Sequence, residues 1–219
     1  MNEIAVIFDM DGVLVDNLKY HVIAWLKFCE NHNIRLTEED FFKNLNGKNS
    51  QDSFKYIFQK TISQSDVQKF TDEKESLYRN LYLNHIKPAE GLIDFLKELK
   101  NNSVKIAIGT SAIEENIDFT LNHTKIKQYF DTIVHAEMVT HGKPAPDIYL
   151  KAAEILNVPI KNCVVFEDAL LGVEAGLKAG MKVVGVTTSH TAEELKHTDL
   201  QVPNFIGLTY DKIKELLHN

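Results

Sequence analysis

The sequence predicts an α/β fold in which a parallel β-sheet is flanked by helices and a separate all-helical segment follows the first strand. Short apolar segments alternate with helical patterns from about residue 92 to residue 217. A similar apolar segment lies at residues 4–8, and no convincing strand pattern follows it until residue 104. Strands that alternate with helices are joined by right-handed crossovers, which produce a mostly parallel sheet with helices on both faces.

The first strand is expected from Asn2 to Phe8. Residues 4–8 are all apolar and rich in β-branched side chains, as in parallel strands that are covered on both faces. Asp9 and Asp11 follow directly. They therefore lie at the carboxyl end of a strand, where open α/β sheets bind their ligands.

Helical spacing replaces the strand pattern after Asp16 and continues to about His85. The predicted helices are one that follows Asn17 as a cap, one that begins at Thr37, and two over residues 51–60 and 66–84. A loop at residues 46–50 precedes the third of these helices. This part of the chain is therefore predicted to be entirely helical.

The domain boundaries follow from the same change of pattern. Residues 87–91 form a linker that returns the chain to the sheet. We therefore expect a discontinuous α/β core of residues 1–16 and 87–219, and an inserted helical cap of residues 17–86. We expect this cap to stand over the carboxyl end of the sheet as a lid.

The remainder of the core is predicted to alternate regularly. The expected strands cover residues 104–108, 132–135, 162–166 and 182–186, and the expected helices cover residues 92–100, 114–121, 146–157, 171–179 and 210–217. Gly172, Gly176 and Gly180 recur at every fourth position. Because no long apolar run surrounds these glycines, we interpret the spacing as close packing of a helix on the sheet.

The composition is that of a packed globular protein. The chain has 219 residues, of which 44% are hydrophobic and 25% are charged, close to the globular average. Its formal net charge of −7 argues against a nucleic-acid partner, because such proteins present a basic surface. A small phosphorylated metabolite needs only a local positive site, so it remains compatible with this charge.

Cysteine usage and the lack of long apolar segments predict a cytoplasmic protein. Cys29 and Cys163 form no CxxC or Cys/His pattern, which disfavours a zinc site or a disulfide framework and predicts buried thiols. No apolar stretch reaches the roughly 18 residues that span a bilayer, and no basic, apolar signal segment precedes the first strand. We expect a cytoplasmic monomer with no membrane partner.

Polar side chains follow the predicted strands. Asp9 and Asp11 are one residue apart, so in an extended segment they project to the same side. Later strand ends and the loops beyond them supply Thr110, Ser111, Lys143, Glu167 and Asp168. Carboxylates, hydroxyls and one lysine at one sheet edge suit Mg²⁺ together with a phosphoryl group. A plain turn at Asp11 and Gly12 is the simpler alternative.

Mg²⁺ and a lysine would solve a charge problem at such a site. A carboxylate that approaches a phosphate to about 4 Å is repelled by about 4 kcal/mol per pair of unit charges, at an effective dielectric constant near 20. Mg²⁺ and Lys143 would offset this repulsion. The alternatives are that Lys143 is a solvated loop lysine and that Thr110 is an ordinary helix cap.

Four motifs, in order along the chain, resemble those of the haloacid dehalogenase superfamily, in the branch with a helical cap that includes β-phosphoglucomutase. The motifs are Asp9-Met10-Asp11-Gly12-Val13, Thr110-Ser111, Gly142-Lys143-Pro144-Ala145-Pro146, and Glu167-Asp168 followed by Gly172 and Gly176. The resemblance covers the whole chain. It implies a Rossmann-like core, a helical cap and phosphoryl transfer.

The resemblance also implies roles for individual residues. Asp9 would be the nucleophile that forms an aspartyl-phosphate, and Asp11 the general acid and base, in agreement with their spacing. Thr110 and the backbone amide of Ser111 would hold phosphoryl oxygens, and Lys143 would neutralise charge.

The same resemblance implies a Mg²⁺ site. Asp9, the backbone carbonyl of Asp11, and Asp168 would hold the ion. Glu167 would be either a further ligand or a partner of one.

Two cap residues match substrate contacts in the resembled branch. His21 matches a histidine that contacts the catalytic acid or the substrate, and Lys74 falls near a lysine of the cap. A surface or core histidine, and a lysine solvated among acidic neighbours, are the simpler alternatives.

The choice between phosphatase and mutase depends on the cap. A mutase must hold a second phosphate, which favours the forked donors of an arginine. The resembled mutases carry that arginine in a cap loop where this chain has Ser50, and the nearby Lys48 offers only a point charge. Glu114 and Glu115 would repel a distal phosphate. We therefore predict hydrolysis of a small phosphate ester such as a sugar phosphate, with a β-phosphoglucomutase-type reaction as the alternative.

Two other classes fit less well. A non-catalytic phosphate-binding protein would not need both Asp9 and Asp11 together with the lysine and the acidic pair. A dehalogenase needs no metal, so the predicted Mg²⁺ ligands argue against it.

Overall fold

The computed structural model describes residues 3–46 and 48–218, which leaves out Asn2 of the predicted first strand and Gly47 of the predicted loop. The chain forms two compact units. Asn17–Ile86 is one of them, and the segments before and after it form the other. The first is called the helical unit below, and the second, which contains the strands, the α/β unit.

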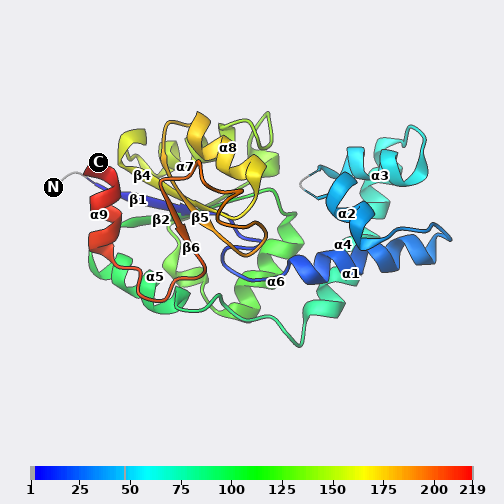
Figure 1. Ribbon diagram of the computed structural model, residues 1–219, viewed down its shortest axis with the longest axis horizontal. Helices are drawn as coiled ribbons and strands as arrows, with labels where there is room; N and C mark the ends of the chain where they lie inside the picture. Colours follow the sequence, from blue (N-terminus) through cyan, green and yellow to red (C-terminus); the bar gives the residue numbers. More distant parts are fainter. Residues whose placement is uncertain (1–2, 47, 219) are drawn as a thin grey trace. The chain divides into compact units, whose positions relative to one another are not determined.

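Six parallel strands form one sheet among the described residues of the α/β unit, in the order β3-β2-β1-β4-β5-β6 (Figure 1). The strands are β1 Ala5–Phe8, β2 Lys105–Thr110, β3 Thr132–His135, β4 Cys163–Glu167, β5 Lys182–Val186 and β6 Leu200–Val202. The predicted parallel sheet is confirmed. Phe8 lies opposite Ile108 of β2 and Phe166 of β4, so the segment after β1 begins between the ends of two neighbouring strands.

Helices cover both faces of this sheet (Figure 1). They are α5 Leu92–Asn101, α6 Glu114–Thr124, α7 Asp147–Leu156, α8 Leu170–Lys178 and α9 Tyr210–His218, with short 3-10 turns η1 Lys127–Tyr129, η2 Ala136–Met138 and η3 Ile160–Asn162. Side chains alternate along a strand. Val6 and Phe8 therefore pack with α5, α6 and α9, whereas Ala5 and Ile7 pack with α7 and α8.

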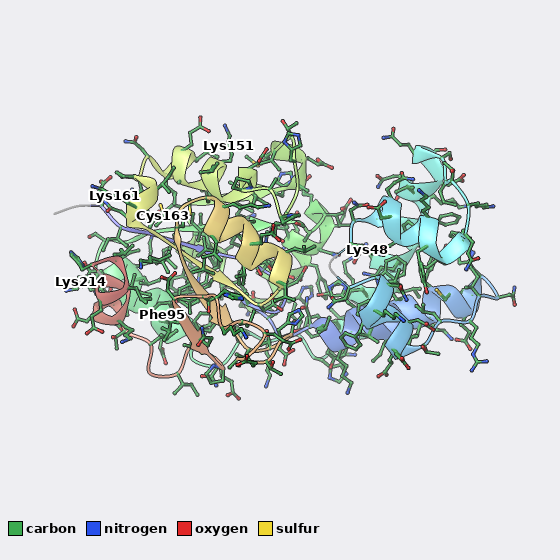
Figure 2. All side chains as sticks on the ribbon, turned by 45° about the horizontal axis from the view of Figure 1, so that its top comes forward. Lys48, Phe95, Lys151, Lys161, Cys163 and Lys214 are labelled. Atoms are coloured by element: carbon green, nitrogen blue, oxygen red, sulfur yellow. The ribbon has the colours of Figure 1, made fainter. Side chains whose placement is uncertain are left out.

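Each face of the sheet has its own apolar core. Phe95 belongs to one core and Cys163 to the other, and both are buried (Figure 2). In the first core the rings of Phe8 and Phe166 stack with their centroids 5.0 Å apart, and Phe205 packs beside them. Burial of each such ring contributes about 1.5–3 kcal/mol. This packing joins the ends of β1 and β4, at the residues that precede the predicted acidic site.

The helical unit contains α1 Leu18–Asn31, α2 Glu38–Asn44, α3 Ser50–Phe58 and α4 Gln64–Tyr82. Its apolar core consists of Val22, Trp25, Phe28, Cys29, Phe41, Leu45, Phe54, Ile57 and Ile62. The predicted start of the second helix is confirmed, because the Thr37 hydroxyl accepts from Asp40 N at 3.1 Å and the Asp40 carboxylate accepts from Thr37 N at 3.1 Å. This reciprocal pair is a capping box.

Two details differ from the prediction, and the state of the cysteines agrees with it. Asn17 precedes α1, but its side chain does not cap the helix and donates instead to the Tyr78 hydroxyl at 2.7 Å. The sequence pattern does not predict β6, because this short edge strand is only half-buried and lacks a continuous apolar run. Cys29 and Cys163 are buried free thiols, as predicted. Among residues 3–46 and 48–218, no helix is both long and apolar enough to cross a bilayer.

Candidate active site

A turn after β1 places carboxylates at the middle of the carboxyl edge of the sheet. Asp9 N donates to Phe166 O at 2.9 Å, which extends the ladder one residue beyond β1. Gly12 N donates to Val15 O at 2.8 Å, and Gly12 has a φ of +78°, a conformation that favours glycine. The turn at Asp11 and Gly12 is therefore present. It does not rule out a functional site, because the same segment contains Asp9 and Asp11.

Two glycines make room for two of the carboxyl groups. A Cβ on Gly12 would lie 1.9 Å from Asp168 Oδ2, and a Cβ on Gly172 would lie 1.6 Å from Glu167 Oε1. Either carboxyl group would have to move to relieve such a clash, and it would then lose its hydrogen bonds. The glycines thus allow the turn after β1 and the start of α8 to close tightly on the acidic residues.

Lys143 lies among these carboxyl groups. Its side chain is 10% exposed, and Nζ donates to Asp9 Oδ1 at 2.5 Å, Glu167 Oε1 at 2.6 Å and Gly109 O at 3.2 Å. Three acceptors match the three donors of an ammonium group. The alternative of a solvated loop lysine is therefore wrong.

Glu167 accepts four hydrogen bonds. Its Oε1 accepts from Lys143 Nζ and from the Tyr149 hydroxyl at 2.8 Å, and its Oε2 accepts from the backbone amides of Asp168 at 2.9 Å and Ala169 at 3.0 Å. A carboxylate has about four lone-pair positions. This arrangement favours Glu167 as the partner that holds Lys143, rather than as a group with capacity left for a metal.

The loop that follows β5 contributes two hydroxyl groups. Ser189 Oγ donates to Asp168 Oδ2, and Thr188 Oγ1 donates to Gly12 O at 2.5 Å. Both hydroxyls thus hold groups at the same sheet edge. One oxygen of Asp168 is engaged by this loop, which fixes the orientation of the carboxyl group.

The carboxylates form a compact buried cluster. Oxygen atoms of Asp9, Glu167 and Asp168 all lie within 4.8 Å of one another. Burial raises the pKa of Asp9 well above its usual 3.8, and although Lys143 opposes this shift, the neighbouring carboxylates add to it. Burial and the charge of Glu167 raise the pKa of Asp168 to about 7. The cluster holds more negative charge than one lysine balances, so its donor set suits a divalent cation.

Lys143 is held in its charged form. Burial alone would lower the pKa of Lys143, but Asp9 and Glu167 outweigh this effect and hold the pKa well above its usual 10.5. At neutral pH the side chain is a counter-charge and a donor of hydrogen bonds. It has no role as a base.

The end of β2 supplies the other predicted core residues. Thr110 is 1% exposed, and its Oγ1 accepts from Ala112 N at 3.0 Å. The capping position of α6 is Ile113, so the alternative of Thr110 as an ordinary helix cap is wrong. Ser111 follows at the surface. Because β2 pairs with β1, both residues lie at the edge that carries Asp9, and their contacts with phosphate stay predictions.

In the helical unit, His21 and Lys74 are in contact. Lys74 Nζ lies 2.9 Å from His21 Nδ1, 2.8 Å from a carboxylate oxygen of Glu75 and 5.2 Å from the ring centroid of Trp25. The His21 ring stacks on Tyr78 at a centroid distance of 3.9 Å. An ammonium group only donates, so His21 Nδ1 accepts from Lys74. Lys74 is 4% exposed, which rules out a solvated lysine.

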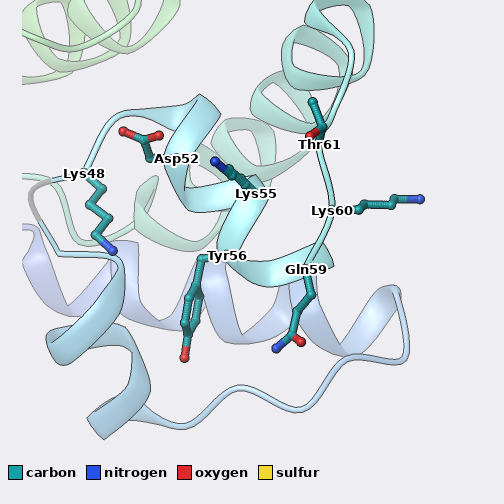
Figure 3. A pocket seen from close by; sticks show the side chains of 7 residues that line it. All are labelled: Lys48, Asp52, Lys55, Tyr56, Gln59, Lys60 and Thr61. Atoms are coloured by element: carbon teal, nitrogen blue, oxygen red, sulfur yellow. The ribbon is translucent and has the colours of Figure 1, made fainter.

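The other two predicted cap residues lie at the start of α3. Ser50 is its first residue, after Asn49, whose side chain caps the helix by accepting from Asp52 N at 2.9 Å. Lys48 lies over the Tyr56 ring at 5.7 Å and lines an open cavity of about 710 Å³ (Figure 3). Their contacts with substrate stay predictions.

Sequence reasoning missed three residues of the α/β site. Thr188 and Ser189 closely follow the end of β5, so the rule that strand ends carry functional groups identifies them when it is applied to that strand too. Tyr149 has no such signal. It occupies a core position of α7, and its hydroxyl partner is fixed only by the fold.

Fold and site together define a Rossmann-like α/β enzyme with a buried acidic cluster, and comparison with known proteins identifies the family. The sequence profile of the haloacid dehalogenase-like hydrolases matches residues 6–186. The chain belongs to this family, as its motifs predicted. The crystal structure of a HAD hydrolase of family IA from Entamoeba histolytica is 32% identical, with a TM-score of 0.92 over 100% of both chains.

Relatives of known name catalyse two kinds of reaction. A phosphorylated carbohydrates phosphatase of Thermotoga maritima is 31% identical over 186 residues, which are 84% of this chain and 86% of that protein. A β-phosphoglucomutase of Bacillus subtilis is 32% identical over 222 residues, covering 98% of this chain and 93% of that protein. The relatives therefore include both a phosphatase and a phosphomutase.

Proposed function

We propose that this protein is a Mg²⁺-dependent phosphatase that hydrolyses a small phosphate ester, such as a sugar phosphate, through an aspartyl-phosphate at Asp9. The observation that best supports the proposal is the Lys143 ammonium between Asp9 and Glu167, beside the buried carboxyl group of Asp168. A nucleophilic carboxylate, a fixed positive charge and a cation site are the parts that phosphoryl transfer requires.

The residues present fit a magnesium ion. Asp9 and Asp168 would hold it together with the backbone carbonyl of Asp11, whereas Glu167 already accepts four hydrogen bonds. When bound, Mg²⁺ would offset the repulsion between these carboxylates and the phosphate of the substrate. The raised pKa values of Asp9 and Asp168 support the same interpretation, because they reflect burial first and the charge of neighbouring carboxylates second, and a bound cation would oppose both effects.

The chain's own residues supply the chemistry. One oxygen of Asp9 attacks phosphorus, and the bond between phosphorus and the ester oxygen breaks while Asp11 gives that oxygen a proton. Water then attacks phosphorus and gives a proton to Asp11, and the phosphoryl bond to Asp9 breaks to release inorganic phosphate. Lys143, Thr110 and the amide of Ser111 hold the phosphoryl oxygens during both steps.

The choice of acceptor depends on Ser50 of the helical unit and on the start of α6 in the α/β unit. Ser50 begins α3 where a mutase would present an arginine to a second phosphate, and Glu114 and Glu115 at the start of α6 add negative charge. These residues favour water over a sugar phosphate as the acceptor. The β-phosphoglucomutase reaction is the second candidate, supported by the match to the Bacillus subtilis enzyme over 98% of this chain.

We further propose that the helical unit is a cap that selects the substrate. His21, Lys74, Lys48 and Ser50 would be its contacts with a small phosphorylated metabolite. The protein would act as a cytoplasmic monomer on this substrate.

A substrate screen tests the proposed reaction. Release of phosphate from sugar phosphates, nucleotides and pyrophosphate is measured with Mg²⁺ and with EDTA. We expect Mg²⁺-dependent release from at least one sugar phosphate, and loss of that release in Asp9→Asn. Steady conversion of β-glucose 1-phosphate to glucose 6-phosphate, primed by glucose 1,6-bisphosphate, would favour the mutase instead.

A further inference from the structure

Tyr149 is buried beside the proposed site, although it carries no group that reacts. It belongs to α7, shortly after Lys143 in the sequence, and its side chain is 0% exposed. Buried tyrosines place their hydroxyl against a partner, because an unpaired polar group costs about 1–3 kcal/mol in the interior. The partner identifies what this residue does.

The Tyr149 hydroxyl and the Lys143 ammonium share one oxygen. The hydroxyl donates to Glu167 Oε1 at 2.8 Å, and Nζ donates to the same atom at 2.6 Å. Nζ also lies 5.0 Å from the centroid of the Tyr149 ring, within range of a cation–π contact. Tyr149 therefore contacts the lysine directly through its ring and indirectly through Glu167.

The end of β2 is shaped around the same ring. A Cβ on Gly109 would lie 3.2 Å from Cε1 of Tyr149, which is tighter than ordinary contact. The carbonyl oxygen of Gly109 accepts from Lys143 Nζ at 3.2 Å. The residue that makes room for the tyrosine is thus also the third acceptor of the lysine.

We propose that Tyr149 is a positioning residue that keeps the Lys143 ammonium directed at Asp9. The inference rests on the proposed function, because it gives this tyrosine a part in phosphoryl transfer. Without the hydroxyl, Lys143 is the one remaining hydrogen-bond partner of Glu167 Oε1 among those described. A buried carboxylate then draws the ammonium toward itself and away from Asp9, where the phosphoryl oxygens would be held.

Tyr149→Phe removes the hydroxyl and keeps the ring. We expect kcat for phosphate release to fall about tenfold, the order of one hydrogen bond to a charged group. Tyr210→Phe, which removes a hydroxyl from the half-buried Tyr210 of α9 on the other face of the sheet, is the matched control and should leave kcat unchanged. An unchanged kcat in Tyr149→Phe would contradict the inference.

A double-mutant comparison separates positioning from a purely structural role. In a Lys143→Met background, Tyr149→Phe should change neither residual kcat nor the affinity for inorganic phosphate by more than about twofold, because the positioned group is gone. Equal losses in both backgrounds would show that the tyrosine acts only on the fold.

A crystal structure of Tyr149→Phe provides a readout that does not need activity. We expect Lys143 Nζ to move away from Asp9 Oδ1, toward Glu167. An unmoved ammonium would overturn the inference, even if the wild-type chain proves inactive toward every phosphate ester. Absence of wild-type turnover would itself count against the proposed function alone.

Discussion

The two units each bury a lysine, but they surround it differently. Lys143 in the α/β unit contacts two carboxylates, with the buried carboxyl group of Asp168 next to them. Lys74 in the helical unit contacts one carboxylate, a histidine and the faces of two aromatic rings. The first surrounding has an excess of negative charge and the second is close to balance. A buried cluster with excess negative charge can bind a cation and take part in the transfer of a charged group. A cluster whose charges are compensated is better suited to holding side chains in place for substrate recognition.

The largest effect is expected from the unbalanced site. Asp9→Asn removes the proposed nucleophile, so phosphate release should fall by at least about a thousandfold. Folding should be retained, because the change also removes one of the buried like charges. Activity assays with circular dichroism on the same samples check both parts, and retained turnover would refute the assignment of Asp9.

Removing each lysine compares the two surroundings directly. Lys143→Met leaves Asp9 and Glu167 buried without a counter-charge and should lower the free energy of unfolding by about 3–5 kcal/mol. Lys74→Met removes one partner of Glu75, whose side chain is 15% exposed, and should lower the free energy of unfolding by about 1–3 kcal/mol. Urea denaturation measures both values. A greater loss for Lys74→Met would reverse the comparison.

The charge excess should also appear as a dependence on pH. The pKa of Asp168 is about 7 in the folded chain, so the folded state keeps a proton between about pH 4 and 7 that the unfolded state releases. The metal-free protein should therefore lose stability as pH rises through this interval, at up to about 1.4 kcal/mol per pH unit for one proton. Thermal unfolding in EDTA across this interval checks the sign.

The proposed Mg²⁺ would compete with the same proton. Its affinity should therefore rise as pH increases through about 7, the pKa of Asp168. Titration calorimetry in buffers of different ionisation enthalpy measures the proton released. A Mg²⁺ affinity that stays constant from about pH 5 to 8 would show that the carboxyl groups are already ionised.

The smallest expected effect concerns the helical unit. Ser50→Arg introduces a forked donor at the start of α3 and should increase turnover in the primed mutase assay by severalfold, on the order of one exposed charge-assisted contact. Ser50→Lys is the matched control, because it adds the same charge without the fork. Equal gains for both variants would show that a positive charge at this position is sufficient and that bidentate geometry is not required.

The two units also differ in how much of them the sequence predicts. The strand ends that carry Asp9, Thr110 and Asp168 follow from apolar runs and from the rule that parallel strands end at one edge. The sequence does not predict β6, because an edge strand of three residues has little apolar surface to bury. The sequence also does not predict the role of the Tyr149 hydroxyl, because helical spacing identifies a core position but not the hydrogen-bond partner of the hydroxyl.

The prediction of the cap residues relies mainly on the resemblance to the family. Nothing in the spacing of His21 and Lys74 predicts that they contact each other, since they belong to α1 and α4 and meet only when these helices pack. The sequence predicts Asn17 as the cap of α1, but its side chain donates instead to the hydroxyl of the buried Tyr78. Tertiary contacts thus override local propensity where polar groups are buried.

The central claim is that Asp9 accepts the phosphoryl group, and trapping tests it most directly. The protein is mixed with Mg²⁺ and its best phosphate ester, quenched in acid within one turnover, digested and analysed by mass spectrometry. We predict a phosphoryl group on Asp9 in the wild-type chain and no phosphorylated peptide from Asp9→Asn. Phosphate release at full rate with the label on another residue would contradict the account.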